Sequence, residues 1–372
     1  MSTETNQPTC AHAFSGVHTV AARRARQHVV VGIVVGAVLM GGCMDQGMTA
    51  PRNTSPLKPS LSVSGPTLTD LGTLGGNFSE ANGINAAGQV VGGSLTSALH
   101  GHAFLWERGK GMQDLGTLGG DFSVAEAIND RAEIVGVSST SMGLEHAFIW
   151  IRGQAMKDLG TLGGPSSESN GINDAGAVVG WSLTGSGLTH AFFWQRGEQM
   201  RDLGTLGGEF SIAHGINNAG QVVGESTLPS IETHAFLWQR GQAMQDLGTL
   251  GGTNSVAHAI NAAGEIVGLS FSASGQDRAF LLRPGQAMQD LGTLGGARSS
   301  ADGISAPGEV IGTSLTTSAE SHAFFWQPVG GMQELGTLGG DMAVATGINA
   351  RGQIVGWSLT SSGATHAVLW TP

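Results

Sequence analysis

The chain has 372 residues, of which 61 are glycine, and only 12% of its residues are charged. This composition excludes a mainly helical protein and predicts short strands joined by tight turns, which is an all-β class. The formal charge is -11, and beyond residue 65 acidic residues clearly outnumber basic ones. Such a surface repels phosphate backbones, so a nucleic-acid partner is excluded.

The N-terminal segment has the three-part layout of a secretory signal. Arginines at positions 23, 24 and 26 precede an apolar run over residues 28–42, which is too short for a confident transmembrane helix. Leu39-Met40-Gly41-Gly42-Cys43 resembles a bacterial lipoprotein processing box, which implies a signal peptide over residues 1–42 and a diacylglycerol group on Cys43. A plain cleaved signal peptide and an uncleaved anchor remain alternatives.

Residues 43–65 hold this cysteine and a stretch rich in Pro, Ser and Thr. We expect the stretch to be a solvated tether between the lipid and a folded domain. Because Cys10 and Cys43 are the only cysteines, the domain that follows has neither a disulfide nor a thiolate metal site.

Residues 66–372 are built from seven repeats with a period of 44 residues. The segment Asp-Leu-Gly-Thr-Leu-Gly-Gly recurs without insertion, a period typical of four-stranded propeller blades. In one unit we predict strands over Ser79 to Asn85, Gln89 to Ser94, His102 to Trp106, and Met112 to Leu115. Asn85-Ala86-Ala87-Gly88 predicts a tight turn whose glycine has positive φ, and Ala132 in the equivalent place is expected to carry about 1 kcal/mol of strain.

The two ends of the repeat region complete each other. Residues 68–71 have no preceding third strand, and the last unit ends at Trp370 without a fourth strand. We therefore predict that residues 68–71 pair with residues 366–370, with Leu68 in the place of the repeated Met. The expected fold is a seven-bladed β-propeller of four-stranded blades, its ring closed by the N-terminal strand; an open solenoid is the alternative.

His-Ala-Phe-Leu-Trp, Gly-Ile-Asn, Gly-Gln-Val-Val-Gly and Asp-Leu-Gly-Thr-Leu-Gly-Gly recur in fixed order over residues 67–371. Together they resemble the HAF repeat family of bacterial extracellular proteins. The resemblance implies an extracellular setting and transfers no activity or ligand. Arg278 for His, Leu282 for Trp and Ser305 for Asn are departures from the pattern.

Most polar residues that could carry chemistry recur in every unit. The repeated histidines could bind a metal, but equal placement in the blades favours a structural hydrogen bond, for instance to the repeated acid. They are His102, His146, His190, His234, His322 and His366. The acids invite a general-acid role and are interpreted in the same structural way; they are Asp70, Asp114, Asp158, Asp202, Asp246, Asp290 and Glu334. We expect no metal and no cofactor.

One polar position varies while its neighbours stay fixed. If the first strand is innermost, this position lines the central channel and forms an asymmetric ring of candidate ligand-binding residues. The ring is Asn82, Glu126, Asn170, His214, His258, Asp302 and Thr346. A solvated channel without a ligand is the alternative. The variable segments between second and third strands, such as 95–101, form a second candidate binding face.

These features predict a monomeric, non-catalytic cell-envelope lipoprotein that binds or scaffolds an envelope or extracellular protein or glycan. Contact with the membrane is expected through the N-terminal lipid only. One alternative is a polysaccharide hydrolase or lyase that uses Glu126, His214, His258 and Asp302, the asymmetric acids and bases of the ring. Another is a structural or adhesive surface repeat.

Overall fold

The computed structural model describes residues 67–372. The chain divides into two units, residues 1–58 and residues 59–372, and all described residues belong to the second. The predicted signal peptide, Cys43 and the tether therefore lie outside the described residues. From Thr67 to Pro372 every regular element is a strand, and no helix in that range could span a membrane.

Each repeat supplies four strands. The first strands are β2 (Gly75–Ile84), β6 (Gly119–Ile128), β10 (Gly163–Ile172), β14 (Ser211–Ile216), β18 (Gly251–Ile260), β22 (Gly295–Ile304) and β26 (Gly339–Ile348). The second are β3 (Val90–Thr96), β7 (Ile134–Thr140), β11 (Val178–Thr184), β15 (Val222–Thr227), β19 (Ile266–Ser272), β23 (Val310–Thr316) and β27 (Ile354–Thr360). The third are β4 (Gly101–Glu107), β8 (Glu145–Trp150), β12 (Thr189–Trp194), β16 (Thr233–Trp238), β20 (Asp277–Leu282), β24 (Ser321–Gln327) and β28 (Thr365–Thr371). The fourth are β5 (Gly111–Asp114), β9 (Lys157–Asp158), β13 (Arg201–Asp202), β17 (Gln245–Asp246), β21 (Gln289–Asp290), β25 (Gly331–Glu334) and β1 (Thr67–Asp70).

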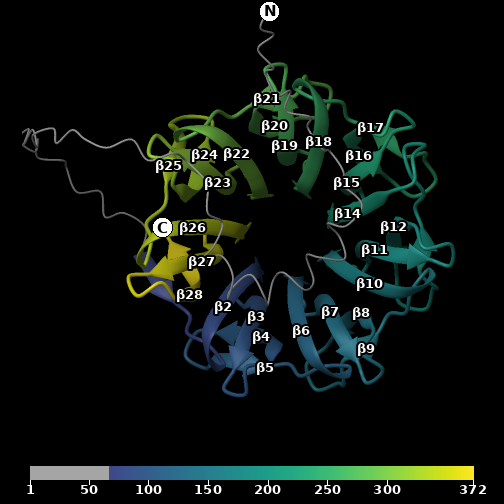
Figure 1. The fold of residues 1–372 in the computed structure, drawn as a ribbon, viewed down its shortest axis with the longest axis vertical. Coiled ribbons are helices and arrows are strands. Elements are labelled where there is room, and N and C mark those ends of the chain that lie inside the picture. The colour runs from purple at the N-terminus through teal and green to yellow at the C-terminus, as the bar shows by residue number, and fades with distance from the viewer. Residues whose placement is uncertain (1–66) are drawn as a thin grey trace, which may run out of the picture. The chain divides into compact units, whose positions relative to one another are not determined.

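The strands of each repeat pair antiparallel in chain order. Repeats 2 to 6 form five four-stranded sheets, and repeats 1 and 7 share one eight-stranded sheet through a parallel pair between Phe78 and Thr365. The predicted pairing of the chain ends is present: β1 lies along β28 with Leu68 opposite Trp370, as Met112 lies opposite Trp106. The sheets are arranged around a common axis with the first strands innermost (Figure 1). The first strand begins at Gly75, earlier than predicted.

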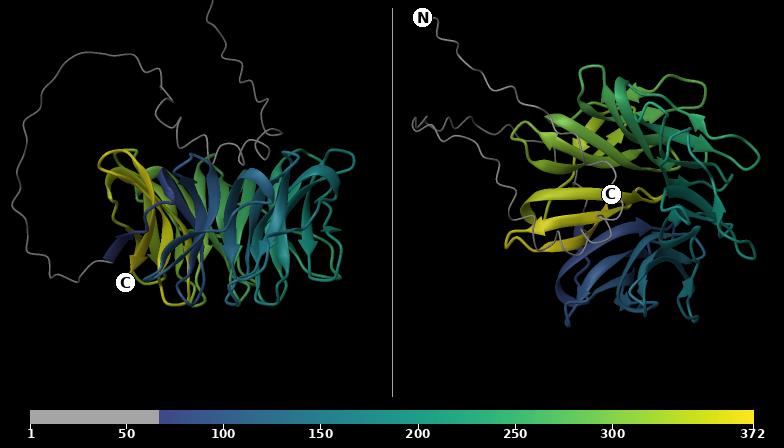
Figure 2. Two further views of the ribbon diagram at one scale, coloured as in Figure 1. Left: turned by 90° about the horizontal axis from the view of Figure 1, so that it is seen from below. Right: turned by 45° about the vertical axis from the view of Figure 1, so that its right-hand side comes forward.

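The strands run between two faces (Figure 2, left). We call one the turn face; it carries the turns between first and second strands, such as residues 85–88, and the hairpins between third and fourth strands, such as residues 107–111. The other is the loop face, which carries the second-to-third-strand loops, such as residues 96–101. In one of the turns on the turn face, Ala132 stands in the place of glycine and has a φ of 58°. This is the positive φ for which we expected strain at Ala132.

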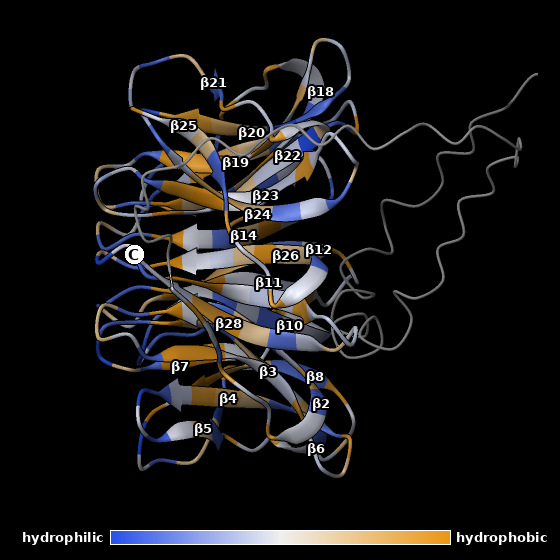
Figure 3. Cartoon of the chain, turned by 90° about the vertical axis from the view of Figure 1, so that its left-hand side faces the viewer, coloured by the Kyte–Doolittle hydropathy of each residue, from blue (hydrophilic) through white to orange (hydrophobic). Residues whose placement is uncertain are grey.

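The core lies between successive repeats. Val91 and Leu105 of repeat 1 pack with Phe148 and Trp150 of repeat 2, and equivalent clusters follow around the axis. Figure 3 shows hydrophobic segments along β4, β7 and β24 and hydrophilic segments in the turns. Close approach of strands explains one repeated glycine, because a Cβ atom at Gly92 would lie 1.9 Å from the carbonyl oxygen of Glu80. Each repeat thus buries its apolar surface against its neighbours.

Asparagine side chains link successive repeats on the turn face. Asn85 Nδ2 donates to the carbonyl of Asn129 at 3.1 Å, and Asn129 Nδ2 donates to the carbonyl of Asn173 at 3.0 Å. The last repeat reaches the first in the same way, since Asn349 Nδ2 donates to the carbonyl of Asn85 at 3.0 Å. The other members of this ladder are Asn173, Asn217 and Asn261.

Serine hydroxyls form a second link. The Ala103 amide donates to Ser123 Oγ at 2.8 Å, and this hydroxyl donates to the Gly116 carbonyl at 2.6 Å, so one buried serine joins repeats 1 and 2. The same bridge recurs at Ser167, Ser211, Ser255, Ser299 and Ser79.

The seam between repeats 6 and 7 lacks both links. Ser305 stands in the asparagine position and donates instead to Glu309 Oε2 of its own repeat at 3.2 Å. Ala343 stands in the serine position and has no hydroxyl. Of the seams among residues 67–372, this one has the fewest recurring side-chain bonds, so we expect it to be the weakest of them.

The double substitution Ser305→Asn with Ala343→Ser should restore both links. We expect the free energy of unfolding to rise by about 1 kcal/mol per hydrogen bond, measured as a higher melting temperature by circular dichroism. The matched control, Asn173→Ser with Ser211→Ala, removes the same two bonds from the seam between repeats 3 and 4 and should lower stability comparably. An unchanged melting temperature in both variants would contradict this account of the seams.

Candidate functional site

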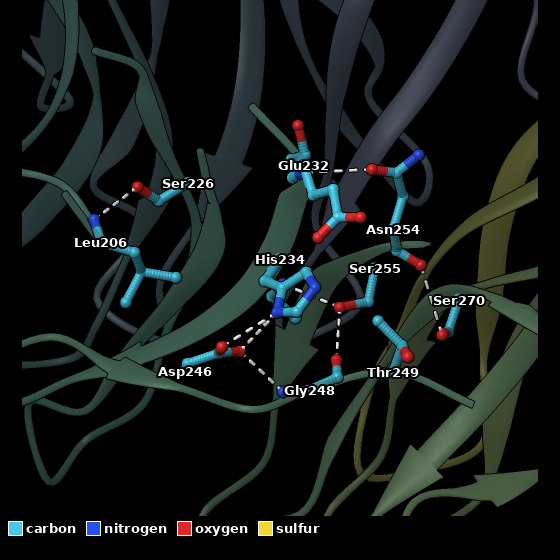
Figure 4. Close-up of polar contacts among 12 residues, drawn as sticks. Leu206, Ser226, Glu232, His234, Asp246, Gly248, Thr249, Asn254, Ser255 and Ser270 are labelled. Atoms are coloured by element: carbon cyan, nitrogen blue, oxygen red, sulfur yellow. Dashed lines mark hydrogen bonds and ion pairs between the residues drawn. The ribbon is translucent and has the colours of Figure 1, made fainter. Parts of the chain in front are cut away.

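The repeated histidines pair with the repeated acids on the third and fourth strands. Nδ1 of His234 lies 2.9 Å from both carboxylate oxygens of Asp246, and Asp246 Oδ1 accepts the Gly248 amide at 2.8 Å (Figure 4). The pair is one of six; in repeat 5, Arg278 replaces histidine and its Nε lies 3.6 Å from Asp290 Oδ2. The predicted histidine-to-acid hydrogen bond is therefore present, and it fixes the turn that leads to the next repeat.

This repetition argues against chemistry at the outer strands. In five of the six pairs the aspartate also accepts a backbone amide of its own turn, so the geometry of these pairs is explained by folding alone. Within residues 67–372 no group of three or more potential metal-ligating side chains converges.

The seven candidate ring residues lie on the innermost strands, and several are tied to the next repeat. Asn82, Asn170 and His258 reach the carbonyls of Ala125, Ala213 and Ala301 at 3.1, 2.9 and 2.9 Å. Thr346 donates to the Ala81 carbonyl at 2.7 Å. These are the ring residues of repeats 1, 3, 5 and 7, so four of the seven predicted ring residues bond to the next repeat. Glu126, His214 and Asp302 occupy the alternate repeats.

The structure brings the ring residues of repeats 4 to 6 together. His214 and His258 pack edge to face with ring centroids 5.7 Å apart. His258 Nδ1 lies 3.2 Å from Asp302 Oδ1, which also accepts the Ser300 hydroxyl at 2.9 Å. On the other side, His214 Nε2 lies 3.3 Å from Glu225 Oε1. We call His214, Glu225, His258, Ser300 and Asp302 the axial cluster.

The axial cluster is suited to binding polar groups. Its imidazoles and carboxylates are partly exposed, between 16% and 27%, so a ligand can reach them. Ser300 donates to Asp302 rather than to an imidazole, so the group is not a serine activated by a base. Thr313, which pairs with Ser300 across the sheet, has a buried hydroxyl with no hydrogen-bond partner among the described residues. Imidazole, carboxylate and hydroxyl groups, which donate or accept hydrogen bonds, are thus gathered on one side of the axis.

Sequence reasoning missed a layer of acids beside the ring. Glu80 and Glu168 lie two residues before ring positions, and Glu225 lies on the neighbouring second strand. The equivalent first-strand residues are apolar in repeats 2, 4, 5 and 7, as Val124 is, and repeat 6 has Ser300. An acid in a mainly apolar column is a signal that could have revealed Glu80. Burial raises the pKa of Glu80 from 4.5 to about 8.

The loop face carries isolated apolar side chains. Leu99, Met142 and Ile231 are 69%, 79% and 88% exposed. Leu99 and Ile231 also have φ of 63° and 67°, in positions where other repeats place glycine such as Gly187. A β-branched residue with positive φ is strained, and such strain is concentrated at functional sites.

Comparisons with known proteins define the class. Neither a protein-family model nor a curated protein matches the chain. Among solved structures, it is similar to the β-propeller domain of the Trilobed protease from Pyrococcus furiosus, with TM-score 0.53 and 10% identity over 79% of this chain and 95% of that one. It is also similar to an acylaminoacyl peptidase from Pyrococcus horikoshii, with TM-score 0.50 and 12% identity over 81% of this chain and 52% of that one. The BP39L lectin from Burkholderia pseudomallei follows with TM-score 0.49 and 6% identity, over 79% and 96% of the two chains.

At such identities the similarity concerns the fold. The chain is an all-β protein of four-stranded antiparallel sheets with the architecture of a β-propeller.

Replacement of Glu80 by Gln should remove a pH dependence of stability. Between about pH 4.5 and pH 8 the unfolded chain has lost the Glu80 proton and the folded protein retains it, so wild-type stability falls as pH rises through this window. We expect Glu80→Gln to become more stable than wild type from about pH 5 to pH 8, by an amount on the order of a few kcal/mol. Thermal unfolding at several pH values measures the difference.

Glu107→Gln is the matched control for this prediction. Hydrogen bonds from Lys110 and, to a smaller extent, from Gln89 lower the pKa of Glu107 to about 2. Glu107 is therefore ionised in the folded and the unfolded protein above about pH 5. Its variant should differ from wild type by a constant amount across the window. A Glu80→Gln curve that runs parallel to wild type would contradict the buried, protonated acid.

Proposed function

We propose that the protein is a non-catalytic binding module of the cell envelope, a closed seven-bladed propeller of HAF-type repeats anchored by a lipid on Cys43. Its partner is a glycan or a protein with polar groups that engage the axial cluster. The observation that carries the proposal is the gathering of His214, His258 and Asp302 on one side of the axis, where the two imidazoles pack together and His258 lies beside Asp302. In a scaffold of near-identical repeats, such local asymmetry indicates selection for a ligand.

Two contacts support closure of the ring. The hydrogen bonds from Asn349 to Asn85 and from Thr346 to Ala81 repeat, across the chain ends, the bonds found between internal repeats. In addition, β1 supplies the fourth strand of repeat 7. A closed ring holds the axial cluster rigidly, and this rigidity lowers the entropic cost of binding.

The loop face favours a second candidate function. Leu99 and Ile231 are exposed apolar side chains with positive φ on this face, so it is suited to the capture of a protein partner.

Binding is tested with a glycan array and an envelope pull-down using the full chain in detergent. We expect His214→Ala, His258→Ala and Asp302→Ala, combined, to lower capture about tenfold or more, since two ion-paired polar contacts are each worth about 1 kcal/mol. The control is His190→Ala with Asp202→Ala, which alters the same residue types at an outer pair. It should retain binding.

The outcomes separate the alternatives. Equal capture by the triple axial variant and the His190→Ala, Asp202→Ala control would contradict the axial site. Loss of capture in a Leu99→Ser, Ile231→Ser variant would favour protein capture at the loop face. Cleavage of a bound glycan by wild type alone would favour the hydrolase or lyase that uses Glu126, His214, His258 and Asp302. No capture by wild type would favour a structural or adhesive repeat.

The anchor is tested by detergent phase partition of the protein expressed in a bacterial host. Wild type should enter the detergent phase, Cys43→Ser should stay in the aqueous phase, and the control Cys10→Ser should behave as wild type, because only a cysteine at the processing site accepts diacylglycerol. Detergent partition of Cys43→Ser would instead indicate an uncleaved apolar anchor. Aqueous partition of all three proteins would indicate a plain signal peptide.

A further inference from the structure

A pocket lies on the turn face between repeats 2 and 3. It is lined by Ile149, Ile151, Gln154, Ala155 and Lys157 from repeat 2 and by Trp194 and Arg196 from repeat 3. We call it the seam pocket. Ile151 is half-buried and Ala155 is exposed, and together they form an apolar floor above the buried Ile149 and Trp194. Gln154, Lys157 and Arg196 are exposed and form a polar rim. It is distant in sequence and strand position from the axial cluster, which lies on the first and second strands.

The next seam shows why this pocket is open. Between repeats 3 and 4, Arg240 lies over the ring of Phe193, 5.1 Å from its centroid, and is held there by Glu198 at 3.0 Å. Phe193 is the equivalent of Ile149, and Arg240 is the equivalent of Arg196. The arginine thus occupies the space above Phe193 at that seam.

In the seam pocket, two sequence differences from the next seam move the equivalent arginine, Arg196, to another partner. Gln154 replaces Glu198, so the hairpin has no carboxylate to hold the arginine. Glu133 replaces Ala177, and its Oε1 binds Arg196 Nη2 at 2.9 Å instead. Ile151 also stands where repeat 1 has Glu107, which binds Arg152 at 3.0 Å. Arg196 is thereby drawn toward the first-to-second-strand turn of repeat 2 and pairs with Glu133.

Lys157 supplies the charge of the pocket. Its Nζ lies 5.3 Å above the centroid of Trp194, and no ion pair between Lys157 and a carboxylate is found among the described residues. The ammonium group is therefore oriented by the indole but not neutralised. Beside it, the Gln154 side chain can donate a hydrogen bond. The pocket thus combines one uncompensated cation, one amide and an apolar floor.

We propose that the seam pocket binds a sugar that bears a carboxylate, with the carboxylate on Lys157 and Gln154 and the apolar ring face on Ile151 and Ala155. A charge-assisted hydrogen bond to Lys157 provides orientation, and the aliphatic floor buries the C–H face of the ring. A simple inorganic anion would leave this floor unused. The site goes beyond the proposed function, since it requires neither the axial cluster nor the lipid anchor.

The test titrates the full chain with glucuronate, glucose and inorganic phosphate, followed by saturation-transfer NMR and calorimetry. Glucuronate is expected to bind more tightly than either of the other probes. Lys157→Gln should weaken glucuronate binding about fivefold or more, in line with a lost contact of about 1 kcal/mol. Arg201→Gln is the matched control, because it removes a cation that also lies over a tryptophan, Trp238, at the next seam; it should have no effect.

A second variant, called the transplant, exchanges the acidic residues and leaves Lys157 and Arg196 unchanged. Glu133→Ala with Gln154→Glu gives the seam pocket the acids of the next seam, so Arg196 should cover the floor and glucuronate binding should be lost, while circular dichroism reports an intact fold. Equal binding of phosphate and glucuronate would overturn the sugar assignment. Glucuronate binding that survives both Lys157→Gln and the transplant would overturn the site. Neither result affects the axial site, whose variants leave the seam pocket unaltered.

Discussion

The bond from an asparagine side chain to the carbonyl of the next repeat underlies the whole structure. Asn85 Oδ1 accepts the amides of Ala87 and Gln89 and so closes its own turn, while Nδ2 donates to the carbonyl of Asn129. One buried side chain thereby couples local turn chemistry to the spacing between repeats. Because each such group would cost free energy if left unsatisfied, every turn must occupy the same place relative to the next. This requirement accounts for a constant period without insertions.

That constraint limits where function can reside. Residues that recur in each repeat, such as the pair of His234 and Asp246, are committed to backbone groups of their own turn. Even in the variable ring at the axis, side chains such as Asn82 and Thr346 form hydrogen bonds to the neighbouring repeat. We therefore place recognition at side chains that break the repeat pattern. His214 and His258 do so at the axis, and Gln154 does so at the seam pocket.

Much of the fold could be predicted from the sequence because the repeat presents each strand seven times in one register. The four strands of a unit, the pairing of Leu68 opposite Trp370 and the histidine-to-acid bonds are all present. The long first strand was underestimated, since Gly75 and Gly76 disfavour a strand by local propensity and are held in it by the pairing with Thr96. Tertiary pairing overrides propensity there.

The candidate site was predicted only in part. The column of ring residues was identified because it is polar in every repeat, but a single sequence does not reveal which members bind a neighbouring carbonyl. Glu80 was missed because its column is mainly apolar. Ser305 is a departure from the pattern in the sequence, and only the structure shows that it interrupts the asparagine ladder. These effects depend on contacts between repeats, which cannot be predicted from the sequence of a single repeat.

Hydrogen–deuterium exchange of the full chain, with and without the partner retained in the envelope pull-down, tests the central claim most directly. The account predicts that bound partner slows exchange in the first strands of repeats 4 to 6, residues 211–216, 251–260 and 295–304, which carry the ring residues His214, His258 and Asp302. Protection confined to the loops at residues 96–101 and 227–233 would contradict it, and would place recognition on the loop face instead.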